Sequence, residues 1–197
     1  MKILNLYAGI GGNRKLWKNV DVTAIEYDEE IANTYQQYFP NDTVIVADAH
    51  KYLLDHYKEF DFIWSSPPCP SHSDIRRCGV HAGQYNAIYP QMDLYQEIIL
   101  LKHFAQSNTK WVIENVKTYY EPLIEPNHKL HRHFYWSNFN ISKFEVTTER
   151  THNKIVGSHT VYGFDIEATK IKNKVKVLRN MVDPELGLHI LNCSKEN

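Results

Sequence analysis

The sequence predicts an α/β fold with a doubly wound, mostly parallel sheet and a small β-rich C-terminal appendage. Short apolar runs alternate with amphipathic segments over residues 1–116, which is the pattern of strands and helices in a parallel sheet. Glycines or acidic residues follow several of these runs, as they do where ligands bind at the carboxyl ends of strands. Beyond residue 117 the alternation stops. At 197 residues and 43% hydrophobic content, the chain can bury one core, so we expect one domain with the appendage attached.

Strands are expected where a short apolar run ends at a glycine, a serine or an acidic residue. They span residues 2–8, 22–26, 43–49, 60–65 and 110–116. Helices are expected between them, over residues 14–20, 28–39, 50–60 and 92–107. The second helix begins with acidic residues, which favour a helix N-terminus, and Pro40 ends it.

The C-terminal part of the chain has a different composition. Residues 118–135 are rich in Tyr, Pro and His, and residues 137–178 hold β-branched runs with no clear helix. Within residues 170–179 four lysines stand at alternate positions, and Arg179 ends the run. This basic strip contacts nucleic-acid phosphates or is a solvated strand face, and the sequence leaves both interpretations open.

Composition limits the class of protein. The formal net charge is −1 and the pI is near 6.8, so any nucleic-acid binding must come from a local basic patch. Three cysteines are too few for a disulfide framework, which fits a reducing compartment. The N-terminal apolar run is too short for a signal peptide, and no run has the length of a membrane span. We therefore expect a soluble, cytoplasmic protein with no membrane partner.

A glycine-rich turn, NLYAGIGGN at residues 5–13, follows the first strand. Glycines there let the backbone approach a ligand closely. The spacing does not match G-x-G-x-x-G, because Arg14 stands at the third position, and no P-loop lysine follows. A dinucleotide or a nucleoside triphosphate is therefore not expected, and an ordinary tight turn is the alternative.

Acidic residues end the second and third strands. Glu26 could accept the hydroxyls of a ribose, Tyr27 could pack on an adenine face, and Asp48 could accept from an adenine amino group. Each acid alone is more often a helix N-cap or a solvated side chain. Together with the glycine turn they trace adjacent strand ends that could hold an adenosine.

The fourth strand runs into SSPPCPSHS, in which Pro67, Pro68 and Pro70 frame Cys69. Prolines fix backbone angles on both sides of the cysteine, which suits a nucleophile held at one angle. A zinc site is the alternative, because Cys69-x-x-His72 and Cys78-x-x-His81 have suitable spacings. The prolines and arginines within these segments argue against it, so no metal is expected.

The fifth strand ends in WVIENV, residues 111–116. A buried carboxyl at a strand end tends to have a raised pKa and can donate a proton or a hydrogen bond. Glu114 is the candidate for this role, and a plain loop acid is the alternative interpretation.

In this order the motifs resemble the cytosine-5 DNA methyltransferase family. The matching segments are NLYAGIGG (5–12), IEYD (25–28), AD (47–48), SPPC (66–69) and ENV (114–116). Weaker matches are RHFYWSNF (132–139), similar to an arginine-bearing motif, and RNMVDPELGLHI (179–190), similar to the last motif. The resemblance implies a Rossmann-like methyltransferase fold that uses S-adenosyl-L-methionine.

The resemblance also implies roles for individual residues. Cys69 would attack carbon 6 of a cytosine, Glu114 would hold or protonate ring nitrogen 3, and Arg132 would steady the base. The cofactor-binding residues would be Tyr7, Ala8, Gly9, Ile10, Gly11, Gly12, Glu26, Tyr27, Asp48, Pro68 and Asn180. The substrate-binding residues would be Ser66, His72, Ser73, Asn115, Lys170, Lys172 and Lys174.

The sequence departs from the family pattern in three places. Residues 70–73 read PSHS where the family often has Gln and a Phe-Ser pair, and Arg132 stands alone between two histidines. The target-recognition region is reduced to residues 139–178, which leaves little surface for reading the major groove. We expect a catalytic domain at 1–138, this reduced segment, and a C-terminal segment at 179–197 that returns to the catalytic domain.

The expected function is DNA (cytosine-5-)-methylation of a cytosine flipped out of duplex DNA. A short or relaxed recognition sequence, or a partner protein that supplies specificity, would compensate for the reduced segment. The reduced size favours an origin in a phage or mobile element, where restriction-modification is one possible role. The alternatives are an RNA cytosine-5 methyltransferase, a non-catalytic nucleic-acid-binding relative and, least favoured, a zinc-binding module.

Overall fold

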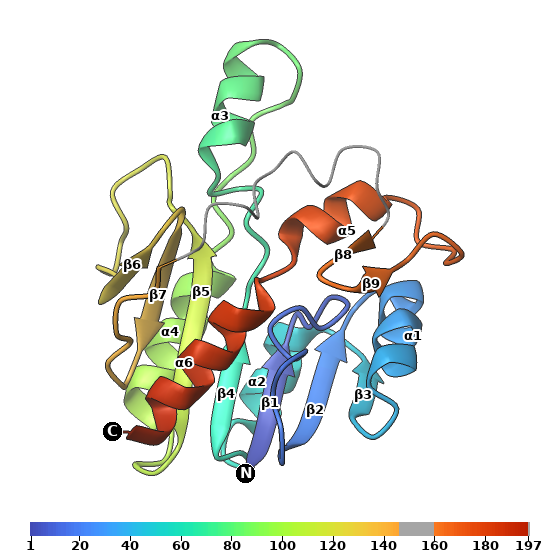
Figure 1. The fold of residues 1–197 in the computed structure, drawn as a ribbon. Coiled ribbons are helices and arrows are strands. Elements are labelled where there is room, and N and C mark those ends of the chain that lie inside the picture. The colour runs from blue at the N-terminus through green and yellow to red at the C-terminus, as the bar shows by residue number, and fades with distance from the viewer. Residues whose placement is uncertain (146–159, 197) are drawn as a thin grey trace.

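The computed structural model describes residues 1–145 and 160–196, and it is built on one seven-stranded sheet (Figure 1). The spatial order of the strands is β3-β2-β1-β4-β5-β7-β6. The first five strands in the chain are parallel, β7 runs antiparallel to β5, and β6 runs antiparallel to β7. The strands are β1 (Lys2–Leu6), β2 (Asp21–Glu26), β3 (Thr43–Val46), β4 (Phe62–Ser65), β5 (Lys110–Val116), β6 (His128–Leu130) and β7 (His133–Ser137).

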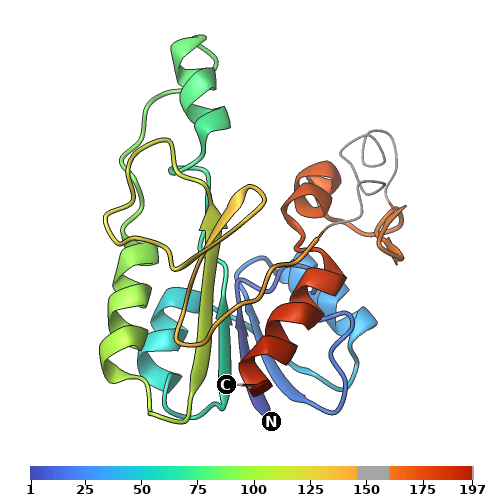
Figure 2. The ribbon, with the colours of Figure 1, turned by 60° about the vertical axis from the view of Figure 1, so that its left-hand side comes forward.

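Helices cover both faces of the sheet (Figure 2). On one face, α2 (Ala49–His56) and α4 (Asp93–Phe104) pack against alternate strand residues such as Leu4, Leu6 and Ile63. On the other face, α6 (Pro184–Glu196) packs against the intervening residues, among them Phe62 and Trp64. Both faces are therefore buried, which explains why the strands are almost continuously apolar in sequence.

The predicted fold class is confirmed, because the described sheet is mostly parallel and is covered on both faces. Each of the expected strands is present, with ends shifted by up to three residues. The helix expected over 28–39 is α1 (Glu29–Tyr38), and those expected over 50–60 and 92–107 are α2 and α4. Strand ends and helix caps carry local sequence signals, so the strands and these three helices could be predicted from the sequence pattern.

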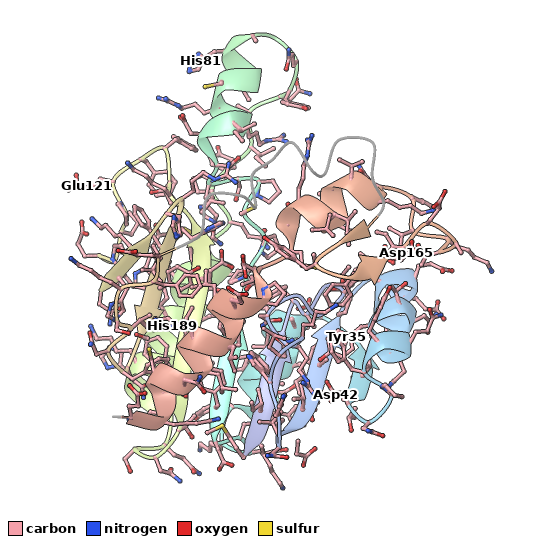
Figure 3. The ribbon with its side chains drawn as sticks, in the orientation of Figure 1. Tyr35, Asp42, His81, Glu121, Asp165 and His189 are labelled. Atoms are coloured by element: carbon pink, nitrogen blue, oxygen red, sulfur yellow. The ribbon has the colours of Figure 1, made fainter. Side chains whose placement is uncertain are left out.

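The helix expected over residues 14–20 was wrong, because this segment forms turns. Besides the hydrogen bonds of its own turns, the segment is held by distant partners. The Arg14 guanidinium donates to both carboxylate oxygens of Asp42 at 2.7 and 2.9 Å, and the Trp17 indole donates to the Gly187 carbonyl of α6 at 3.1 Å. Tyr35 also donates to Asp42 at 2.8 Å, and Figure 3 labels this pair beside α1. These tertiary contacts override the weak helical pattern.

The strand-like interpretation of residues 170–179 was also wrong. The structure places α5 at Lys174–Asn180, where Asn173 caps the helix by accepting from the Lys176 N–H at 3.1 Å. The described part of the appendage also contains a short hairpin, β8 (Thr160–Val161) and β9 (Phe164–Asp165). Part of the expected β-rich region, residues 146–159, lies outside the described residues.

The appendage packs beside the glycine turn and α1. Phe164, Ile166, Ile171 and Leu178 form one buried cluster with Ile10 of the turn. The Tyr38 hydroxyl of α1 lies 2.6 Å from the Asp165 carbonyl oxygen. The division into a catalytic domain, a recognition segment and a returning segment stays a prediction. None of the described helices combines the length and apolarity that a membrane crossing requires.

Candidate active site

The glycine turn, Glu26, Cys69 and Glu114 lie at the carboxyl ends of β1, β2, β4 and β5. The strand order reverses between β1 and β4, and such a switch point is where open α/β sheets bind ligands. The glycine turn leaves β1 here, the proline-framed cysteine leaves β4, and Glu114 stands near the end of β5. Residues far apart in the sequence thus share one edge of the sheet.

The glycine turn has a left-handed backbone at three residues and is open to a ligand at one of them. Tyr7, Gly9 and Gly11 have φ angles of 55°, 56° and 85°. Glycine adopts such angles without steric cost, so the strain falls on Tyr7. A Cβ built on Gly9 would meet no atom of the described chain within 4 Å, so this backbone can be approached by a ligand. Gly11 and Gly12 have a steric reason to be glycines, because a Cβ there would collide with Phe39 and Met181 respectively.

The Glu26 carboxylate ties the glycine turn to the end of β2. One oxygen accepts from the Gly9 N–H at 2.9 Å, and the other accepts from the N–H groups of Tyr27 at 2.9 Å and Asp28 at 3.1 Å. A carboxylate has about four acceptor positions, so an acceptor position remains for a ligand hydroxyl. The Tyr27 ring next to it is 79% exposed and free to cover a flat ligand.

Asp48 is the N-cap of α2. Its Oδ1 accepts from the N–H groups of His50 at 3.0 Å and Lys51 at 3.2 Å. The helix N-cap is one of the two roles that the sequence analysis left open for Asp48. Its Oδ2 lies 4.0 Å from the Lys51 ammonium, at the exposed end of the helix. A ligand amino group could therefore still reach the second oxygen.

A buried acid below the glycine turn was missed by the sequence reasoning. Glu97 of α4 is fully buried and accepts from the Tyr7 hydroxyl at 2.7 Å and from the Ser65 hydroxyl at 2.5 Å, and His50 Nδ1 lies 3.1 Å away. Burial and the negative charge of Glu97 raise the pKa of Tyr7 far above its ordinary value. The hydrogen bond to Glu97 raises the pKa of His50. The available signal was an acid between Leu94 and Leu101, on the apolar face of α4.

The Cys69 loop is fixed by hydrogen bonds on both sides of the cysteine. The Asn115 amide of β5 donates to the Pro67 carbonyl at 2.9 Å. The Cys69 carbonyl accepts from the N–H groups of His72 at 3.0 Å and Ser73 at 3.1 Å. Together with the prolines, these bonds hold the thiol in one place.

His72 supports this loop from the inside. Its side chain is fully buried, and its Nδ1 lies 2.6 Å from the Tyr120 hydroxyl. Its carbonyl accepts from the Tyr119 N–H at 3.1 Å. Burial lowers the pKa of the imidazole, so the ring is neutral at pH 7. A buried ring in this position orients the loop and offers no surface to a base.

The charges around Cys69 oppose one another. Burial, followed by the negative charge of Glu114, raises the pKa of the Cys69 thiol, while the positive charge of Lys176 on α5 lowers it. The thiol is therefore protonated in the resting protein at pH 7. In residues 1–145 and 160–196, no group of three or more His, Cys, Asp or Glu side chains is arranged to hold a metal ion.

Glu114 is 8% exposed, and a histidine side chain faces its carboxylate. His133 Nε2 of β7 lies 3.4 Å from its carboxylate. Arg132 stands one residue earlier, with an exposed side chain, and its carbonyl accepts from the Lys117 N–H at 2.8 Å. The arginine is thus at the correct edge of the sheet, but the structure brings His133 to the acid.

The remaining predicted residues lie at different depths. Ser66 accepts from the Trp64 indole at 2.9 Å, and Ser73 caps α3 (Asp74–His81) by accepting from the Arg76 N–H at 3.2 Å. Pro68 is exposed beside the thiol, while Ala8 and Ile10 are buried in the turn. Asn180 is exposed at the end of α5, next to Met181, which packs on Gly12.

The lysines of the basic strip do not act as one face. Lys170 and Lys172 are exposed before α5, whereas the Lys174 ammonium donates to the Glu167 carbonyl within the appendage at 2.5 Å. Lys176 is the lysine whose charge reaches Cys69. Lys170 and Lys172 precede α5 and Lys174 and Lys176 lie on it, so the four side chains do not form one strand face.

Comparisons with solved structures give low similarities. A SAM-dependent methyltransferase from Agrobacterium tumefaciens is 14% identical with a TM-score of 0.43, over 61% of this chain and 40% of its own. A hypothetical protein from Thermus thermophilus is 14% identical with a TM-score of 0.47, over 69% and 73%. A putative DNA modification methyltransferase from an E. coli prophage is 20% identical with a TM-score of 0.38, over 61% and 33%. At TM-scores this low, these likenesses add no argument.

The chain thus spans less than half of the first of these proteins. No curated protein matches the sequence. A family model described as C-5 cytosine-specific DNA methylase matches residues 1–176, which is most of the chain and includes Cys69 and Glu114. The chain belongs to the C-5 cytosine-specific DNA methylase family.

Proposed function

We propose that the protein is an S-adenosyl-L-methionine-dependent DNA (cytosine-5-)-methyltransferase. The observation that carries the proposal is the pairing of Cys69 and Glu114 in a member of this family. Cys69 follows β4, and Glu114 lies near the end of β5, the adjacent parallel strand. The hydrogen bond from Asn115 to Pro67 joins β5 to the cysteine loop. Glu114 is close enough for its charge to act on the thiol.

The residues at the ends of β1, β2 and β3 fit the cofactor. Gly9 offers open backbone, Glu26 keeps an acceptor position for a ribose hydroxyl, and exposed Tyr27 can cover an adenine. Asp48 can accept from the adenine amino group through its second oxygen. When bound, S-adenosyl-L-methionine supplies an electrophilic methyl group.

The proposed chemistry begins with Cys69 and the ring of a flipped-out cytosine. The thiolate forms a bond to carbon 6, and the electron pair of the carbon 5–carbon 6 double bond makes carbon 5 nucleophilic toward the methyl group. Glu114 donates its proton to ring nitrogen 3 and so stabilises the charge that the attack creates. Loss of the carbon 5 proton to solvent, with return of the nitrogen 3 proton to Glu114, then breaks the bond to sulfur and restores the thiolate.

Positioning explains much of the architecture. A nucleophile must meet the ring face at a fixed distance and angle, and small displacements are costly. Three prolines, the Asn115 amide and buried His72 fix the thiol from different directions. We assign the substrate phosphates to exposed Lys170 and Lys172, and the reduced recognition segment to residues 139–178.

The test is transfer of a labelled methyl group from S-adenosyl-L-methionine to unmethylated DNA and to bulk RNA. We expect the label in DNA, lost in Cys69→Ala and retained in Cys78→Ala, which changes an exposed cysteine on α3. Label in RNA alone would replace DNA by RNA as the substrate. Equal transfer by Cys69→Ala and the parent protein would eliminate the covalent mechanism.

A further inference from the structure

An arm projects beyond the carboxyl end of the sheet and is not accounted for by the proposed chemistry. It consists of α3 and the returning residues 82–92, with His81 labelled near its outer end (Figure 3). The two halves are tied together: the Gln84 N–H donates to the Gly79 carbonyl at 2.8 Å, and Arg76 donates to the Asn86 carbonyl at 3.0 Å. The arm is therefore a built element with fixed walls.

The base of the arm is also fixed. The Gln91 N–H donates to the Ser71 hydroxyl at 3.0 Å, and Ser73 forms an isolated antiparallel bridge with Thr118. These contacts join the start and end of the arm to the Cys69 loop and to the segment after β5. Any ligand held by the arm is consequently held at a set position relative to the thiol.

A cavity of about 140 Å³ lies between the two halves of the arm and the segment after β5. Its walls include Arg76 and Val80 of α3, Ala87 and Ile88 of the returning chain, and the Tyr119 side chain. Pro70 also lines it, and Pro70 is bonded to Cys69, so the cavity begins one residue from the proposed nucleophile.

The size and walls of the cavity suit one aromatic ring. A cavity of about 150 Å³ lined by apolar side chains accommodates a benzene molecule, so about 140 Å³ accommodates a single six-membered ring. Val80, Ala87 and Ile88 supply apolar contacts, and Tyr119 supplies an aromatic surface of the kind on which extruded bases stack. The cavity is less suited to an anion, because the Arg77 guanidinium in its wall already forms an ion pair with Asp74 at 2.6 Å.

Arg76 leaves a hydrogen-bond donor unused in this wall. Its Nε is buried and has no hydrogen-bond partner among the residues that the structure describes. Its guanidinium is otherwise engaged, lying 5.3 Å from the centre of the Tyr85 ring and bonded to Asn86. An unpaired buried donor is costly, and an oxygen or ring-nitrogen acceptor on a base would satisfy it.

We propose that this cavity receives a base of the substrate strand next to the target cytosine. The inference rests on the proposed function, because it requires a nucleic acid at Cys69. The ligand is a nucleobase with one face on Tyr119, its edge toward Arg76 and its other contacts with the aliphatic wall. The arm therefore supplies sequence preference beside the target, which the short recognition segment has little surface to provide.

The test uses DNA duplexes that contain one target cytosine and a single abasic site at one flanking position, with a different position in each duplex. Affinity is measured by fluorescence anisotropy in the presence of S-adenosylhomocysteine, so that no turnover occurs. With the unaltered protein, we expect removal of the base at one flanking position to weaken binding about tenfold, the scale of one stacked base.

Filling the cavity should abolish this difference. Val80→Phe, and separately Ala87→Phe from the opposite wall, should bind the intact and abasic duplexes equally. Ile75→Phe is the matched control, because Ile75 is on the same helix, is 75% exposed and is outside the cavity lining. This control should retain the tenfold difference.

Other outcomes would overturn the inference. Equal binding of all abasic duplexes by the unaltered protein would show that no flanking base enters the cavity. If Arg76→Gln weakens binding to every duplex alike and reduces the salt dependence by about one phosphate, the arm contacts the backbone instead. Failure to bind any duplex, intact or abasic, would remove the proposed function and this inference with it.

Discussion

Replacement of Glu97 by leucine should destabilise the protein strongly, because the carboxylate accepts from two hydroxyls, one of which is fully buried. Ser65 is fully buried and Tyr7 is half-buried, and both hydroxyls donate to Glu97. A buried donor left without a partner costs about 1–3 kcal/mol, so these two hydroxyls together cost about 2–6 kcal/mol. His50 keeps access to water and adds little.

For a chain of this size, each kcal/mol lowers the melting temperature by about 2–4 °C. We therefore expect Glu97→Leu to melt about 4–24 °C lower in calorimetry. Glu97→Gln is the control, because it preserves shape and one acceptor and should lose much less. Calorimetric titration with S-adenosyl-L-methionine should also show weaker binding by Glu97→Leu, since Tyr7 begins the glycine turn.

The reasoning can be refuted with a compensating variant. If the cost comes from orphaned hydroxyls, Tyr7→Phe and Ser65→Ala added to Glu97→Leu should recover most of the lost stability, because no donor then lacks a partner. A triple variant that is no more stable than Glu97→Leu would show that the loss comes from packing. A Glu97→Leu protein as stable as the parent would refute the network altogether.

Further predictions concern titration and the loop. The pKa of His50 is raised in the folded protein, so its stabilising contribution is complete below its ordinary pKa near 6.5 and is lost as pH rises through the raised value. In His50→Gln, the free energy of unfolding should therefore vary less with pH over this window. A pH dependence identical to that of the parent protein would contradict the contact with Glu97. Glu114→Gln removes a negative charge near the thiol of Cys69, so the pH midpoint for alkylation of Cys69 should fall while methyl transfer is lost. A midpoint that rises would show that Glu114 does not raise the pKa of the thiol. Asn115→Ala removes the hydrogen bond to Pro67, which should lower the free energy of unfolding by about 1 kcal/mol but reduce methyl transfer at least tenfold. A loss of methyl transfer no larger than the loss of stability would assign Asn115 a purely structural role.

Strands and strand-end residues were predictable because their signals are local. Apolar runs that stop at glycine, serine or an acid define β1, β2 and β4, and parallel strands bring their carboxyl ends to one edge. Cys69 and Glu114 could therefore be placed together from sequence, although the structure alone supplies the hydrogen bond from Asn115 of β5 to Pro67 of the cysteine loop.

Other parts depend on contacts that no local pattern contains. Tyr7 and Glu97 are separated by 90 positions in the chain, and His133 reaches Glu114 only because β7 pairs with β5. In α5, lysines at alternate positions mimic a strand, yet burial of Leu178 against the appendage and capping by Asn173 select a helix. Tertiary burial outweighs a weak periodic signal in a segment of this length.

The proposed reaction requires Cys69 as a thiolate, whereas burial, followed by the negative charge of Glu114, raises the pKa of its thiol. The thiol must therefore lose a proton when the substrate binds. A proton placed on Glu114 would cancel the negative charge that contributes to this raised pKa, and it would supply the donor that ring nitrogen 3 of a cytosine requires. The positive charge of Lys176 favours the thiolate throughout, because it lowers the pKa of Cys69. A single proton on Glu114 would thus serve both the nucleophile and the base, which is the physical reason for assigning these two residues to one proposed mechanism.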